Sequence, residues 1–255
     1  MNSSKPRALV LSGDGIHGET ETAHAFRLAG FDSEIRHLND LITERMTLDE
    51  LSRSYSAFAI PGGASFGDCL APGKILALKL KHKLGWDLEG FANRGGLVIG
   101  IANGFQTLIQ MGVFGKDLAI APNPSGRFVD EWVKVTPMGS RCTWLKGLGT
   151  LDLPVRVSDG KMVISATRKT EVVGKMNRHG MMCLRYEGDP YQSEESLAGL
   201  CDMTGRILGI LPQPEGFLRW TAHPEWTSQP GRASAPGQGL ALFENAYQEA
   251  LRSKG

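Results

Sequence analysis

A glycine-flanked turn at residues 100–104 has the form of a site for covalent catalysis. Its sequence, Gly100-Ile-Ala-Asn-Gly104, follows directly on an apolar run. A G-x-nucleophile-x-G turn between a strand and a helix is a nucleophile elbow, whose glycines permit the sharp turn that lifts the central side chain above the edge of a sheet. The central residue here is Ala102, whose methyl group has neither a lone pair nor a proton to exchange. The pattern therefore predicts the geometry of a nucleophile without its chemistry.

A second turn, at residues 13–18, could hold a phosphate. Gly13-Asp-Gly-Ile-His-Gly18 matches the G-x-G-x-x-G fingerprint of dinucleotide-binding proteins, and Glu34 follows at about the spacing of the acidic residue that binds ribose. A pyrophosphate at a helix N-terminus needs positive potential, whereas Asp14, Glu19 and Glu21 surround this turn with carboxylates. We therefore favour a glycine turn before a helix whose first turn carries acidic residues, and we expect no bound cofactor.

The elements that must position these turns are predicted from apolar runs and from helical periodicity. The expected strands are Ala8–Leu11, Ser33–Leu38, Tyr55–Ile60 and Leu97–Ile101. The expected helices are Thr20–Ala29, a short one opened by a capping box at Thr47–Glu50, one from Pro72 to Leu84, Asp87–Asn93 and Asn103–Met111. Strands that alternate with helices predict a doubly wound parallel sheet.

The second half of the chain is predicted to be richer in strands. They are Trp132–Thr136, Val155–Val157, Met162–Ala166, Met182–Tyr186, Leu197–Met203 and Ile207–Leu211. A helix over Gly239–Arg252 follows the loop-like stretch Thr227–Gln238. Because the sequence has no repeats and no other linker-like tract, we expect residues 1–255 to form a single α/β domain with a β-rich second half.

Composition excludes several classes of function. The chain has 255 residues, of which 41% are hydrophobic and 22% charged, as is typical of a globular protein. Its formal net charge of +1 provides no electrostatic attraction for a nucleic acid, so no such partner is expected. The first residues lack the apolar core of a signal peptide, and no stretch approaches the roughly 20 apolar residues of a membrane span. We therefore expect a cytoplasmic protein without a membrane partner.

Cysteine and histidine spacing does not predict a metal centre. Cys69, Cys142, Cys183 and Cys201 are far apart in the sequence and form no C-x-x-C pair, and the six histidines lack metal-ligand spacing. We expect reduced thiols rather than a disulfide set or a zinc site.

Further motifs accompany the elbow in a fixed order. They are Pro61-Gly-Gly-Ala-Ser-Phe-Gly-Asp68, Ala71-Pro-Gly-Lys74, Gly100-Ile-Ala-Asn-Gly-Phe-Gln106, Ser125-Gly-Arg-Phe128 and Gly205-Arg-Ile-Leu-Gly209 before Pro212-Gln-Pro-Glu215. With these motifs the chain resembles the glutaminase subunit or domain of phosphoribosylformylglycinamidine synthase, a class I glutamine amidotransferase of purine biosynthesis. The resemblance spans residues 8–250. It implies a flavodoxin-like fold, glutamine as the ligand and a protein partner of the synthetase type.

The resemblance also assigns roles to residues. In that family a cysteine thiolate attacks the carboxamide of glutamine, a histidine moves the proton and a glutamate orients the histidine. Glu215 takes the place of the orienting acid, whereas Ala102 and Gln213 replace the cysteine and the histidine. The substrate and oxyanion positions fall on Gly62, Gly63, Ser65, Phe66, Asn103, Gly104 and Gln106.

At two of the three triad positions that the resemblance implies, the residue therefore cannot perform the family's catalytic step. Gln213 forms hydrogen bonds but cannot shuttle a proton near pH 7. Loss of a triad nucleophile costs about 10⁶-fold in rate, and loss of further members adds little. The double replacement thus favours a natural pseudoenzyme over a single substitution made to trap substrate. The family's N-P-N-G-S loop is also missing, and Tyr191–Ser196 occupies its region.

Two alternatives would keep the chain active. His223 and Glu225 lie in a second H-P-E sequence, and could be the base and its partner. Cys69 follows the glycine-rich loop, and could be a relocated nucleophile, although a small buried thiol is the commoner role.

Three functions follow from the sequence. The first is a catalytically silent glutaminase-like scaffold or regulator of a purine-synthase complex. The second is an active glutaminase that uses His223 or Cys69. The third is a non-enzymatic module that binds another small metabolite.

Overall fold

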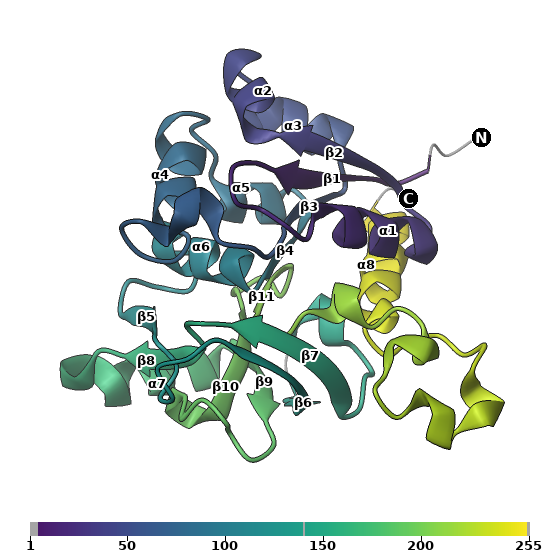
Figure 1. The fold of residues 1–255 in the computed structure, drawn as a ribbon. Coiled ribbons are helices and arrows are strands. Elements are labelled where there is room, and N and C mark those ends of the chain that lie inside the picture. Colours follow the sequence, from purple (N-terminus) through teal and green to yellow (C-terminus); the bar gives the residue numbers. More distant parts are fainter. Residues whose placement is uncertain (1–4, 140, 254–255) are drawn as a thin grey trace.

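A computed structural model describes residues 5–139 and 141–253. Within these ranges nine strands form one continuous sheet, in the order β2-β1-β3-β4-β11-β10-β9-β6-β7 (Figure 1). Its parallel part consists of β1 (Arg7–Ser12), β2 (Asp32–His37), β3 (Ala57–Ile60), β4 (Leu97–Ile101) and β11 (Ile207–Ile210). Its antiparallel part adds β10 (Leu197–Cys201), β9 (Met182–Tyr186), β6 (Val129–Pro137) and β7 (Leu151–Val157).

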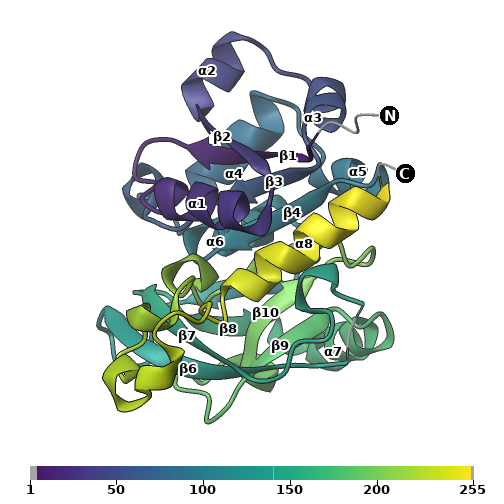
Figure 2. The same cartoon turned by 90° about the vertical axis from the view of Figure 1, so that its right-hand side faces the viewer.

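Helices cover both faces of the parallel part, which is why β3 and β4 are uniformly apolar and buried. On one face α1 (Glu19–Ala29) packs against α8 (Leu240–Ser253) (Figure 2). On the other face lie α4 (Lys74–His82), α5 (Leu88–Asn93) and α6 (Asn103–Met111). The doubly wound sheet with a β-rich second half is therefore confirmed.

Several elements differ from those predicted. Three elements were not predicted: α2 (Leu38–Thr43), β5 (Leu118–Ala121) and α7 (Lys169–Arg178). The predicted strand at 162–166 is β8 (Lys161–Ile164), which pairs with β5 in a separate small sheet. α2 and β5, with six and four residues, are too short to give a clear pattern. α7 is mostly polar and buries only Met176, so it lacks the broad apolar face that marked the other helices. The capping box at Thr47 and Glu50 is present and begins α3 (Leu48–Ser54).

Two predicted boundaries next to a proline are wrong. The predicted strand 155–157 is the end of the longer β7, which contains Pro154. Because β7 is the last strand of the sheet, one side of it needs no ladder hydrogen bonds, so a proline is tolerated there. Pro72 was expected in the first helical turn, but α4 begins at Lys74 after Gly73 in the left-handed conformation.

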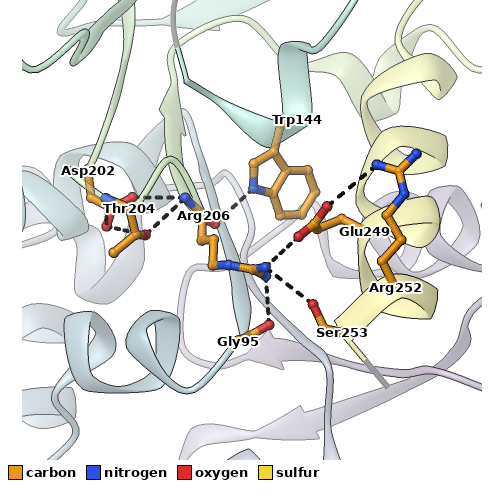
Figure 3. Close-up of polar contacts among 8 residues, drawn as sticks. All are labelled: Gly95, Trp144, Asp202, Thr204, Arg206, Glu249, Arg252 and Ser253. Carbon is orange, nitrogen blue, oxygen red and sulfur yellow. Dashed lines mark hydrogen bonds and ion pairs between the residues drawn. The ribbon is translucent and has the colours of Figure 1, made fainter. Parts of the chain in front are cut away.

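Side chains join the two halves of the sheet. Phe26 of α1 makes edge-to-face contacts with Trp144 and Phe243, at centroid separations of 6.3 and 5.1 Å. Arg206, at the start of β11, donates to the carbonyl of Gly95 at 2.9 Å and pairs with Glu249 of α8 (Figure 3). These contacts fix α8 across the junction of the parallel and antiparallel strands. No helix in the described ranges has both the length and the apolar character needed to cross a bilayer.

Candidate functional site

The loops that follow β1, β3, β4 and β11 meet at one edge of the sheet. These strands are neighbours and parallel, so their carboxyl ends lie together. β1 lies between β2 and β3 in the sheet, and the chain runs from β1 to β2 on one side and then returns to β3 on the other. This reversal of strand order makes the edge a topological switch point, the usual ligand site of open α/β sheets. The first turn, the glycine-rich loop, the elbow and the Gln213–Glu215 segment therefore converge in space.

The elbow has the strained backbone of a nucleophile site. Ala102 has φ 48° and ψ −107°, between the end of β4 and the start of α6. A non-glycine residue at positive φ is uncommon and costs about 1–3 kcal/mol unless its surroundings impose it. The surroundings of Ala102 hold it in this conformation, because its N–H donates to the carbonyl of Ile210 at 2.8 Å. A β-carbon built on Gly104 would lie 1.8 Å from the carbonyl oxygen of Ile60, so only glycine fits there.

Asn103 fastens the glycine-rich loop to the elbow. Its Oδ1 accepts the Ser65 N–H at 3.0 Å, and its Nδ2 donates to Asp68 and Gln106, each at 2.9 Å. Gln106 in turn donates to the carbonyl of Asp159 at 2.9 Å. As the first residue of α6, Asn103 also presents a main-chain N–H that the helix itself leaves without an acceptor, as an oxyanion donor requires.

The glycine-rich loop after β3 packs directly against the dinucleotide-like turn at residues 13–18. His17 donates its N–H to the carbonyl of Gly62 at 3.0 Å, and Ala64 donates to Gly15 at 2.8 Å. A β-carbon built on Gly15 would lie 2.1 Å from the carbonyl oxygen of Ala64, so the loop packs where a cofactor phosphate would bind. Gly18 lets the start of α1 approach the site, because a β-carbon there would lie 3.3 Å from the main-chain nitrogen of Gly62.

Ala102 and Gln213 flank the same glycine. A β-carbon built on Gly62 would lie 3.5 Å from Cβ of Ala102 and 3.4 Å from Nε2 of Gln213. The main chain of Gln213 is held by its N–H, which donates to the carbonyl of Pro154 at 2.8 Å. The two positions that the resemblance assigns to the nucleophile and the base are therefore adjacent, and neither an alanine nor a glutamine side chain can attack or deprotonate a substrate.

A cavity of about 390 Å³ opens beside these positions. Gly62, Gly63, Gln213 and Glu215 lie in its wall, together with His17, Gly18, Glu21, Ala64, Phe128, Arg156 and Gly216. The other predicted site residues are not among these described wall residues: Ala102, which is 2% exposed, Ser65, Phe66, Asn103, Gly104 and Gln106. The ring of Phe66 instead lies under the ammonium group of Lys79. The oxyanion assignments stay predictions.

Glu215, which was predicted to be the orienting acid, is buried. It is 7% exposed, and among the described residues its Oε2 has no hydrogen-bond partner. Burial raises its pKa to about 8, and the nearby carboxylate of Glu21 adds to this rise. An orienting glutamate accepts a ring N–H from the catalytic histidine, whereas Gln213 provides none here. Glu215 therefore favours its neutral form.

His223 lies away from this cavity, in an aromatic cluster. Its Nε2 is 3.1 Å from Oδ2 of Asp152, and its Nδ1 accepts the main-chain N–H of Glu225 at 3.1 Å. The ring stacks on Trp220 with centroids 5.1 Å apart and an interplanar angle of 8°. Both ring nitrogens are therefore occupied. Neither His223 nor Glu225 is among the described wall residues of the cavity, so the geometry does not favour them as a catalytic pair.

Cys69 is exposed at the end of the glycine-rich loop and is also not among the described wall residues. The expectation of a small buried thiol is therefore wrong for this cysteine.

Sequence reasoning did not select Glu21, Phe128 or Arg156 as site residues. Phe128 lies within a motif that carried the resemblance, and Glu21 was noted as a carboxylate beside the turn at residues 13–18. Arg156 lies on β7 and pairs with Asp130 at 3.3 Å, and the tertiary contact of β7 with the segment Pro214–Gly216 brings it to the cavity.

Comparison with known proteins agrees with this geometry. Residues 5–248 match the CobB/CobQ-like glutamine amidotransferase domain. The chain is 35% identical to phosphoribosylformylglycinamidine synthase subunit PurQ of Dehalococcoides mccartyi, over 97% of this chain and 98% of that protein. It is also 35% identical to subunit PurQ of Methanococcus maripaludis, over 86% of this chain and 85% of the relative.

Solved structures support the same assignment. The structure of PurLQS from Thermotoga maritima matches with a TM-score of 0.72 and 26% identity, over 97% of this chain and 98% of that chain. A glutamine amidotransferase of the same organism matches with a TM-score of 0.53 and 15% identity, over 99% of this chain and 95% of that chain, which supports the fold alone. The predicted class I glutamine amidotransferase fold is confirmed. The chain therefore belongs to the CobB/CobQ-like glutamine amidotransferase family and, within it, to the family of PurQ subunits of phosphoribosylformylglycinamidine synthase.

Proposed function

We propose that this chain is a catalytically silent glutaminase-like subunit, which associates with a synthetase-type partner and acts as a scaffold or regulator. Its relatives are subunits of a synthase, which supports a protein partner of that kind. In this proposal the chain keeps a folded site for glutamine but lacks the groups that hydrolyse glutamine in the family.

One observation carries the proposal. Ala102 occupies the strained elbow at φ 48°, with a methyl group where a thiolate would attack. The flanking glycines and the Asn103 hydrogen bonds are all present, so the site keeps its architecture. The position of the base is filled by Gln213, and the orienting acid Glu215 lacks a partner for its Oε2 among the described residues. Hydrolysis of an amide by this route needs both missing groups.

The cavity still suits a small zwitterionic amino acid. Arg156 offers a cation for a carboxylate, and Glu21 offers an anion for an ammonium group. Glutamine carries both groups and an amide that Gln213 can hydrogen-bond. We infer that glutamine binds without being turned over.

Glutamate release from glutamine tests the proposal. The chain is compared with an Ala102→Cys/Gln213→His variant, each alone and with the synthetase subunit of the same genome. We expect turnover only in the double variant, with the unaltered chain about 10⁶-fold slower. Turnover by the unaltered chain would contradict the proposal, and His223→Ala and Cys69→Ser variants would then show which alternative group acts.

Association is measured separately. Co-purification of the unaltered chain with the synthetase subunit, together with glutamine binding by calorimetry, is expected. Binding of another metabolite without any synthetase association would favour the non-enzymatic module instead.

A further inference from the structure

Three of the four cysteines lie together in the interior, although they are far apart in the sequence. Cys142, Cys183 and Cys201 are each at most 2% exposed, and their sulfur atoms all lie within 4.8 Å of one another. Each comes from a different segment: Cys142 precedes the short helix Thr143–Leu145, Cys183 is on β9 and Cys201 ends β10. The fourth cysteine, Cys69, is exposed.

Two of these thiols lie on neighbouring strands of the sheet. β10 pairs antiparallel with β9, with Leu200 opposite Met182 and Gly199 opposite Leu184, and the register shifts at Cys183 between them. Cys201 follows Leu200 as the last residue of β10. Cys142 is brought over them because Thr143 donates its N–H to the carbonyl of Gly205, at 2.9 Å, in the turn between β10 and β11. The grouping thus depends on rigid elements, as a ligand site requires.

We propose that Cys142, Cys183 and Cys201 form a buried three-coordinate site for a thiophilic metal ion of the copper(I) class. Soft thiolate ligands select copper(I), zinc and iron–sulfur centres. Three sulfurs placed about 2.3 Å from a central ion would lie about 4.0 Å apart in a plane. Since the sulfur atoms lie within 4.8 Å of one another, no pair has to close by more than about 0.8 Å to reach that spacing. Each thiol that coordinates as a thiolate releases one proton to solvent, and no electron is transferred.

The number of ligands distinguishes copper(I) from zinc. Structural zinc takes four ligands, whereas the group holds three cysteines and, among the described residues, no histidine or carboxylate. The neighbouring Asp202 is already engaged, since its Oδ1 accepts the N–H groups of Arg206 and Ile207 and its Oδ2 accepts from Thr204 (Figure 3). The sequence predicted no metal site, because the spacing of these cysteines carries no signal.

An anaerobic titration of the full chain with copper(I), in competition with a chromophoric chelator, tests the proposal. We expect the unaltered chain and the Cys69→Ser control to take up one equivalent. Cys183→Ser and Cys201→Ser should each bind at least about 100-fold more weakly, because loss of a ligand exceeds the 10–100-fold effect of losing an outer-shell partner. X-ray absorption of the loaded unaltered chain should show three sulfur neighbours.

Any one of four results would contradict the copper(I) site. The unaltered chain would take up no copper(I), or the Cys69→Ser control would lose its uptake. Alternatively, Cys183→Ser would bind copper(I) as tightly as the unaltered chain, or an equal amount of zinc(II) would displace copper(I). Circular dichroism of the metal-free variants checks that they fold. If they do not, the X-ray absorption of the unaltered chain decides: three sulfurs support the site, and two or fewer refute it. None of these readouts depends on glutamine or on the synthetase partner.

Discussion

The side chain of Asn103 accepts a hydrogen bond from the main-chain N–H of Ser65 at 3.0 Å, and so joins the elbow after β4 to the loop after β3. Both groups are buried, so no solvent molecule replaces either partner when the bond is lost. The loop is therefore fixed to the elbow by the residue after Ala102 and not by the side chain of Ala102 itself.

Replacement of Asn103 by alanine should loosen the site and destabilise the chain. The Ser65 N–H loses its acceptor in a buried position, which costs about 1–3 kcal/mol. For a chain of this size we expect a Tm lower by about 4–8 °C at a loss of 2 kcal/mol, measured by calorimetry. Asn177→Ala, at an exposed position of α7, is the control and should change Tm little. An unchanged Tm in Asn103→Ala would contradict the assigned role.

Gly104→Ala should be among the most damaging single substitutions. The new β-carbon would lie 1.8 Å from the carbonyl oxygen of Ile60, so β3 and α6 would have to separate. We expect a loss above about 3 kcal/mol, or failure to fold. At Gly149 a β-carbon meets no atom within 4 Å, so Gly149→Ala serves as the matched control. Urea unfolding of both variants measures the difference, and equal stabilities would refute the close approach.

A histidine placed at position 213 should lower the pKa of a cysteine placed at position 102. Both positions flank Gly62, so a protonated imidazole at 213 would stabilise a thiolate at 102 and lower its pKa. In a Cys69→Ser background we expect Ala102→Cys/Gln213→His to titrate about one pH unit or more below Ala102→Cys. The ultraviolet absorbance of the thiolate gives the titration.

A histidine at an exposed and distant position provides the control. Ala102→Cys/Gln229→His adds the same group without the proximity, and its thiol should titrate like that of Ala102→Cys. Identical titrations in all three variants would show that positions 102 and 213 do not face each other.

Glu215 should make stability fall as pH rises. Burial raises its pKa from 4.5 to about 8, so between these values the folded chain binds more protons at this group than the unfolded chain does. Stability from Glu215 is therefore fully present below about pH 4.5 and is lost as pH rises toward 8. Relative to Glu215→Gln, the unaltered chain should lose about 2–4 kcal/mol between pH 5 and pH 8.

Denaturant unfolding at a series of pH values measures this difference. Glu244→Gln, on the exposed side of α8, controls for the loss of a carboxylate. A constant difference between the unaltered chain and Glu215→Gln from pH 5 to pH 8 would show that Glu215 is ionised like an exposed acid.

Local sequence determined much of the architecture around the site. The uniformly apolar run 97–101 and the glycine-flanked turn after it predicted β4, the elbow and α6 with their observed bounds. The capping box at Thr47 was correct for the same reason, since its hydrogen bonds join residues three positions apart. The missing nucleophile at Ala102 could also be seen from residue type alone. These features depend on contacts between residues close in the chain.

The tertiary structure alone decided which distant segments meet. Arg156 reaches the cavity because β7 packs against the segment Pro214–Gly216, and β5 and β8 form a strand pair from segments that are distant in the sequence. The cluster of Cys142, Cys183 and Cys201 likewise comes from the order of strands. Sequence spacing records local geometry, whereas the approach of distant side chains depends on strand order and on packing across the whole sheet. For this reason the sequence determined the form of the elbow, and only the fold decided what surrounds it.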